Sequence, residues 1–90
     1  MTGLLQDQAD PPAAPLLRAL WLGLRGEWTS AHEIVQAEGG ADAAWVHAWL
    51  HRIEGDTANA AYWYRRARKA VAEGGTDAEA EAIAQALSLR

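Results

Sequence analysis

Large apolar side chains recur every three or four positions within residues 42–54, the spacing of one face of an α-helix. We predict that this stripe faces the core; it consists of Trp45, Val46, Trp49, Leu50 and Ile53. Similar spacing elsewhere in the chain predicts four more helices, over about 15–24, 28–38, 57–73 and 77–89. The hydrophobic pattern therefore predicts an all-α fold of about five helices.

A single glycine separates the third and fourth predicted helices. Gly55 stands where a helix commonly ends in a left-handed residue, and glycine takes a positive φ without the steric cost of a Cβ atom. Asp56 follows it and is a favourable N-cap, because its carboxylate can accept from the free N–H groups of the next helical turn. These two residues predict an antiparallel helical hairpin with a very short turn.

The same arrangement occurs earlier in the chain. Gly26 lies 29 positions before Gly55 and is also placed between two predicted helices. An internal repeat of about 30 residues is typical of helical arrays. At this offset the positions around the two glycines correspond in pairs: Leu20 with Trp49, Leu24 with Ile53, Ala31 with Ala60, and Val35 with Tyr64.

The second copy of this pattern resembles known helical repeats. Its large, glycine, small and aromatic positions are similar to those of tetratricopeptide repeats, and the run GDTANAAYWYRRA resembles the related Sel1-type repeats. The resemblance implies two αα-hairpins of this type, followed by the 77–89 helix as a C-terminal cap. Such arrays present surfaces for protein segments.

Two segments are also similar to a family of short bacterial and fungal proteins of uncharacterised function. The segments are AHEIVQ, residues 31–36, and VHAWLHRIEGDTANAAYWYRRA, residues 46–67. This resemblance supplies no activity, but it implies a bacterial source and a special role for the run that contains histidine and asparagine.

Prolines and glycines mark the limits of the expected domain. Pro11, Pro12 and Pro15 predict a flexible N-terminal lead-in over 1–15 without a core element, apart from a loosely docked turn at Leu4 and Leu5. Residues 16–90 then form one helical-repeat domain. Within it, the pair Gly74-Gly75 is expected to end the fourth helix, and Thr76 with Glu79 matches a capping box for the fifth.

Composition narrows the classes of function. The chain of 90 residues has five Trp, no Cys and a formal net charge of −4. An acidic chain with one short basic run is a poor nucleic-acid binder, and no disulfide framework is possible. We also see neither a signal peptide nor a membrane span, so we expect a cytoplasmic protein.

Three polar residues form a stripe on the third predicted helix. His47, His51 and Glu54 are spaced i, i+4 and i+7, and the helical count turns them away from the apolar face. Two histidines at i and i+4 suit a divalent metal with a carboxylate as the third ligand, and His32 could add a fourth. A solvated stripe and a site for an organic ligand are the alternatives, and we assign no metal from the sequence alone.

Four further residues are candidate ligand-binding groups. Gln36 lies on the same predicted helix as His32, and Asn59 lies in the first turn after Asp56, where it can also bond locally. Tyr62 and Arg66 are placed to stack on a helix surface, or to form a patch for an anionic ligand or an acidic peptide.

Two functional hypotheses follow. The first is a small interaction module that binds a protein segment or forms a homodimer, without cofactor or catalysis; a Trp left at the surface would support it. The alternative is a site for a small ligand or a divalent metal, with simple acid–base hydrolysis as its chemistry. That site requires convergence of His32, His47, His51 and Glu54.

Overall fold

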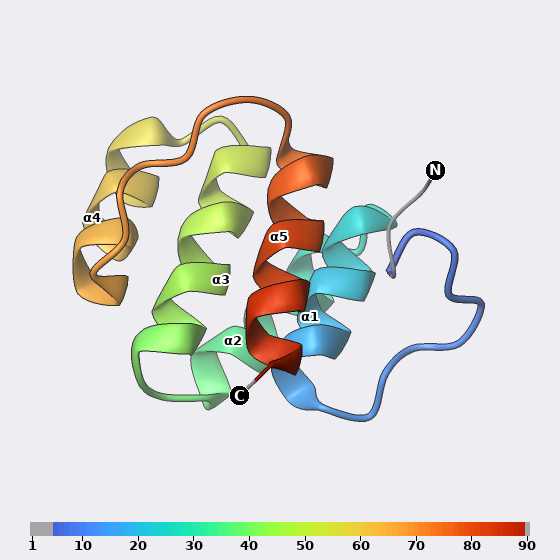
Figure 1. Cartoon of the computed structure of the whole chain (residues 1–90). Coiled ribbons are helices and arrows are strands. Elements are labelled where there is room, and N and C mark those ends of the chain that lie inside the picture. Colours follow the sequence, from blue (N-terminus) through green and yellow to red (C-terminus); the bar gives the residue numbers. More distant parts are fainter. Residues whose placement is uncertain (1–4, 90) are drawn as a thin grey trace.

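The protein consists of five helices in the computed structural model, which describes residues 5–89 (Figure 1). No strand is present in this part of the chain, so the prediction of an all-α fold is confirmed. The helices are α1 (Pro15–Leu24), α2 (Trp28–Ala37), α3 (Ala41–Ile53), α4 (Thr57–Ala67) and α5 (Thr76–Ser88).

Two helical hairpins turn on the predicted glycines. α1 packs against α2 and α3 packs against α4, while Gly26 and Gly55 have φ angles of 82° and 84°. Only glycine takes such angles without strain. Asp56 caps α4, because its Oδ1 accepts the backbone N–H of Asn59 at 3.1 Å. The predictions for both corners and for the cap are confirmed.

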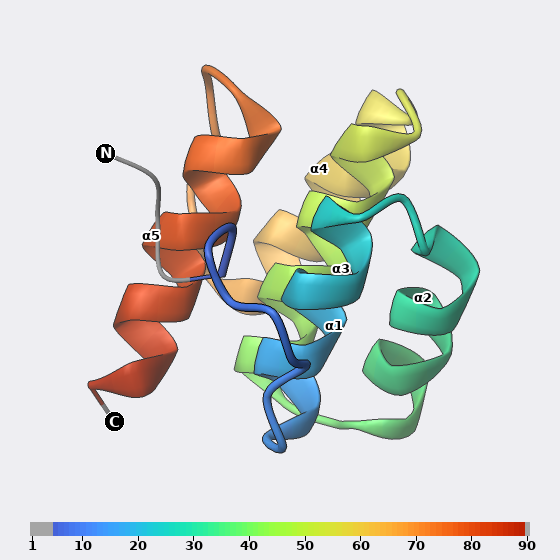
Figure 2. The same ribbon diagram turned by 90° about the vertical axis from the view of Figure 1, so that its right-hand side faces the viewer.

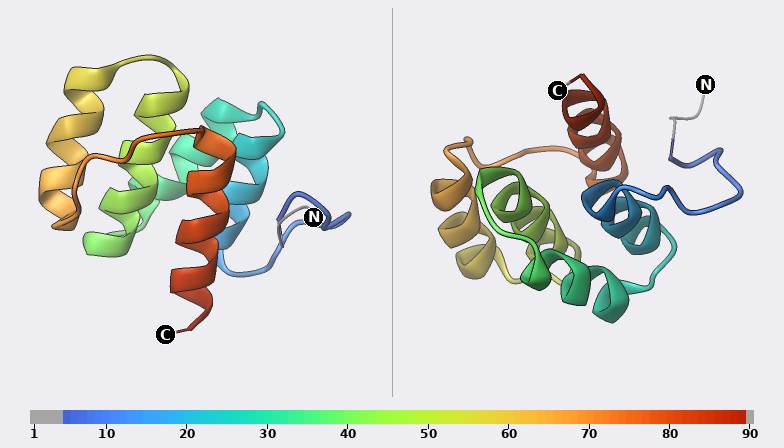
Figure 3. Two further views of the ribbon diagram at one scale, coloured as in Figure 1. Left: turned by 45° about the horizontal axis from the view of Figure 1, so that its top comes forward. Right: turned by 90° about the horizontal axis from the view of Figure 1, so that it is seen from below.

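Helix α3 lies at the centre of the molecule. It contacts α1, α2, α4 and α5, and the view from below shows it surrounded by its neighbours (Figure 3). Its residues 46–51 are all buried, so the helix has no single core face. Ile53 is 38% exposed, contrary to prediction, because it is the last residue of the helix and lies at the corner.

Helix α5 covers the core between the two hairpins. It packs against α1 and α3, on the side opposite to α2 (Figure 2). Glu79 ties it to the second hairpin, because it accepts from Arg52 Nη1 at 2.6 Å and from the hydroxyl of Tyr64. The predicted capping box is therefore wrong: the N-cap is Gly75, and the carboxylate of Glu79 is used in this buried contact.

Helix α4 ends six residues before the predicted limit of about 73. Arg68 adopts a left-handed conformation with φ of 61°, and the N–H of Lys69 donates back to the carbonyl of Tyr64 at 3.0 Å. Residues 68–75 then cross to the start of α5, and a longer α4 would not allow this. Val71 is consequently 57% exposed and Ala70 is exposed, so neither contributes to the core.

The segment before α1 contributes to the core, where only a loosely docked turn was expected. Leu5 is only 3% exposed and belongs to the main hydrophobic cluster, while Leu4 lies outside the described residues. The backbone carbonyl of Gln8 accepts from Trp21 Nε1 at 2.9 Å and from Arg25 Nη2 at 2.7 Å. Residues 5–8 are therefore held against α1 through both apolar and polar contacts.

Candidate metal centre

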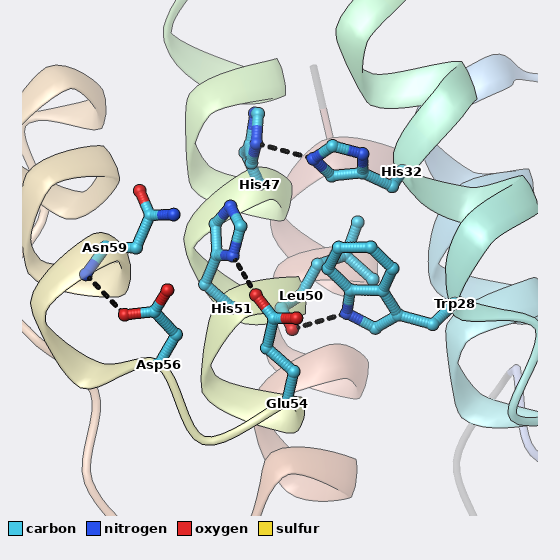
Figure 4. Close-up of polar contacts among 8 residues, drawn as sticks. All are labelled: Trp28, His32, His47, Leu50, His51, Glu54, Asp56 and Asn59. Carbon is cyan, nitrogen blue, oxygen red and sulfur yellow. Dashed lines mark hydrogen bonds and ion pairs between the residues drawn. The ribbon is translucent and has the colours of Figure 1, made fainter.

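Helices α2 and α3 bring three histidines together (Figure 4). His32 comes from α2, whereas His47 and His51 come from successive turns of α3. The Nε2 atoms of His32 and His47 are 3.1 Å apart, and one ring nitrogen of each of the three histidines lies within 4.8 Å of the other two. The three histidines of the ligand-site hypothesis therefore converge, whereas its fourth member, Glu54, reaches only His51.

The histidines lie inside the protein. His47 and His51 are each 6% exposed, and His32 is half-buried. The sequence predicted that this stripe of α3 is turned away from the core, but α2 and α4 cover it on both sides. A solvated stripe is thus ruled out for His47 and His51.

Two tryptophans form the walls of the cluster. Trp28 stacks on His32 with ring centroids 4.6 Å apart, and Trp63 stacks on His47 at 3.8 Å. The indole N–H of Trp28 donates to the carbonyl of Leu50 at 2.7 Å, which fixes its ring. Trp28 was expected in the core and not at a ligand site, although its i, i+4 spacing to His32 was a usable signal.

Burial keeps two of the imidazoles neutral. Burial, followed by the nearby His32 and His51, lowers the pKa of His47 to about 4. The pKa of His32 is lowered first by burial and then by His51, while Glu54 opposes the change. Both rings are therefore neutral at pH 7 and retain a lone pair, which is the form that binds a metal ion.

Glu54 contacts His51 and orients it. Its Oε1 lies 2.5 Å from Nδ1 of His51. When Nδ1–H donates to this carboxylate, the lone pair is on Nε2. Carboxylate–histidine pairs of this kind commonly fix the ligand nitrogen of a metal site. Asp56 is also near His51 and Glu54, but it caps α4.

The spacing of the nitrogens suits a tetrahedral metal ion. With Zn–N distances of about 2.0–2.1 Å, two ligand nitrogens of a tetrahedral site are roughly 3.4 Å apart. The His32–His47 separation of 3.1 Å is close to this value, and all three nitrogens lie within 4.8 Å of one another. Three protein ligands would leave the fourth position of such an ion open.

A cavity of about 600 Å³ lies beside the cluster, between α2, α3 and the face of α4. Gln36, His47, Trp63 and Arg66 contribute to its lining. Two of the predicted ligand-binding residues, Gln36 and Arg66, thus line the same cavity as His47.

The remaining candidates have local contacts on α4. Tyr62 is 44% exposed and accepts a hydrogen bond from Arg66 Nη1 at 3.2 Å, with the guanidinium over its ring. The predicted Tyr62–Arg66 stack is present. Asn59 is half-buried, and its side chain lies near His51 (Figure 4).

Comparison of the chain with protein-family models, with curated proteins and with solved structures found no match. Within residues 5–89, no helix has the length and apolar character to cross a membrane. The geometry alone defines the candidate site: two buried histidines and one half-buried histidine converge beside a cavity in an all-α fold.

Proposed function

We propose that the protein binds a divalent transition-metal ion of the zinc class through His32, His47 and His51. The convergence of three imidazoles from two helices, with one nitrogen of each within 4.8 Å of the others, carries this proposal. Two of these rings are held neutral by burial, so little proton loss opposes binding at pH 7. Imidazole ligands favour zinc, copper, nickel or iron over calcium and magnesium.

The open fourth position suggests chemistry as well as structure. Structural zinc sites usually have four protein ligands, whereas catalytic sites have three and a bound water. A zinc ion in such a position lowers the pKa of its water to about 7 and so supplies a nucleophile for hydrolysis. In this proposal Glu54 is a positioning residue that acts through His51.

Zinc titration of chelator-treated protein without a histidine tag tests the proposal. We expect one zinc ion per chain, and a gain of about 2.7 kcal/mol in unfolding free energy at a free zinc concentration 100 times Kd. His32→Gln, His47→Gln and His51→Gln should each lower the affinity by about 100-fold or more, and Glu54→Gln by about 10–100-fold.

Glu33→Gln is a matched control, because Glu33 is exposed and lies next to His32 on α2. Its zinc affinity should equal that of the wild type. The competing explanation is a cluster in which the His32–His47 contact is only a hydrogen bond. The absence of stoichiometric zinc binding, or an equal affinity in the histidine variants and the control, would establish that explanation and refute the metal site.

The interaction-module hypothesis is the second candidate and stays a prediction. A Trp left at the surface was the feature that would favour it, yet all five Trp side chains are buried or half-buried. Sedimentation at increasing protein concentration tests the homodimer, and capture from a lysate tests the protein partner.

A further inference from the structure

The cavity next to the histidine cluster has one strongly charged donor. The lining residues with polar side chains are Gln36 from α2, Glu38 directly after α2, His47 from α3, and Trp63 and Arg66 from α4. Arg66 presents a guanidinium, which binds planar oxyanions through paired hydrogen bonds. The cavity volume of about 600 Å³ lies in the range of small-ligand sites.

A metal ion at this cluster would also attract an anion. Neutral imidazoles leave the two positive charges of a divalent ion uncompensated, because each contributes a lone pair but no charge. Glu54 is in contact with His51 and offsets part of this charge. The metal and Arg66 together outweigh Glu38, so the cavity becomes net positive when the metal is bound.

We infer that the cavity binds a small oxyanion, a carboxylate or a phosphate, which Arg66 holds while one of its oxygens occupies the open position of the metal. His47 is the residue common to the cluster and the cavity, so the ligand approaches the metal at that imidazole. Gln36 is a further polar group on the α2 side of the cavity, and its amide can donate to the same anion. This inference rests on the proposed metal site and names the class of ligand that the site accepts.

Titration of the metal-free and zinc-loaded protein with acetate and with inorganic phosphate tests the inference. Zinc is added at no more than one equivalent per chain, and binding is followed by calorimetry and by the backbone amide NMR signals of Gly39, Gly40 and Ala41, which line the cavity. We expect zinc to increase the affinity for at least one of the two anions by about tenfold or more. The anion that binds more tightly shows whether the site prefers a carboxylate or a phosphate.

Arg66→Gln and Arg65→Gln form a matched pair of variants. Both residues are exposed on α4, but only Arg66 lines the cavity. Loss of a charge-assisted hydrogen bond should weaken anion binding by about tenfold or more in Arg66→Gln, with zinc affinity unchanged, whereas Arg65→Gln should match the wild type.

The outcomes separate the two proposals. If zinc binds but neither anion does, or if both arginine variants bind anion equally, the oxyanion inference is wrong and the metal site stands. If an anion binds equally with and without zinc, it does not reach the metal, and the inference is also wrong. If zinc itself does not bind, the metal site fails and the inference falls with it.

Discussion

Gly23 is a position where α1 packs tightly against α3, and Gly23→Ala tests this packing. A Cβ atom at Gly23 would lie 2.5 Å from Cη2 and 2.6 Å from Cζ3 of Trp49, and 3.3 Å from Cδ2 of Leu50. Trp49 is fully buried, and its indole N–H donates to the carbonyl of Thr76 at 2.7 Å. The ring therefore cannot move away without disturbing the start of α5.

Two opposing terms determine the magnitude of the effect. Alanine is favoured over glycine inside a helix by about 1 kcal/mol, whereas extra volume in a well-packed core costs about 1–3 kcal/mol or more. Contacts below 3 Å with a fixed ring place Gly23→Ala at the upper end of that cost. We therefore expect a net loss of at least about 1 kcal/mol in urea unfolding, equivalent to a Tm decrease of about 4–8 °C.

Two comparisons test the stated cause. Gly39→Ala meets no atom within 4 Å and should be neutral or slightly stabilising. Trp49→Phe removes the ring atoms that the new Cβ would meet, so Gly23→Ala should cost less in that background. An equal cost in both backgrounds, or no difference between Gly23→Ala and Gly39→Ala, would refute steric conflict with Trp49.

Three further substitutions test the hairpin corner and the attachment of α5, each by urea unfolding. Asp56→Ala removes the N-cap of α4 and should cost about 1 kcal/mol. Gly55→Val forces a branched residue into a left-handed conformation and should cost at least about 1 kcal/mol; a neutral result would contradict that geometry. Glu79→Ala leaves Arg52 and Tyr64 without their buried partner and should cost about 2–4 kcal/mol, so a loss below 1 kcal/mol would contradict a role in holding α5.

The features that were predicted correctly from the sequence depend on neighbouring residues. Helix type follows from apolar spacing within one segment, and the corners follow from single glycines whose φ angles are 82° and 84°. The cap at Asp56 likewise involves a residue only three positions away. Such signals are complete within a short window of sequence, so no knowledge of tertiary packing is needed.

The features that were predicted wrongly depend on which helices surround a given one. A helical count assumes one buried face, but α3 has neighbours on several sides. Its small residues were a signal of this: Ala43, Ala44 and Ala48 are all buried, and Ala48 packs against α4. The length of α4 and the partner of Glu79 were also unpredictable, since both depend on where α5 docks.

The candidate site combines both kinds of information. The i, i+4 pair His47 and His51 is local and was identified from the sequence. The approach of His32 depends on the packing of α2 against α3, which sequence spacing allows but does not require. Gln36 and Arg66 come from different helices, so only the tertiary structure places them at one cavity with His47.

The acid sensitivity of the metal-free protein provides a final test of the buried site. The pKa of His47 is lowered from 6.5 to about 4 in the folded protein. Between these values the unfolded chain binds a proton that the folded chain excludes, so this contribution to stability is present above about pH 6.5 and is lost as pH falls toward 4. The full effect of such a shift is about 3 kcal/mol.

Replacing His47 with Gln removes this pH dependence. The stability difference between wild type and His47→Gln in urea, measured with chelator present, should therefore be larger at pH 7.5 than at pH 4.5. The stability difference between wild type and Gly39→Ala, a substitution that involves no titrating group, should be the same at both pH values. If His47→Gln instead costs more at pH 4.5, the folded protein holds His47 as a cation. A charged His47 has no free lone pair for a metal ion, so that result would count against both the neutral cluster and the proposed metal site.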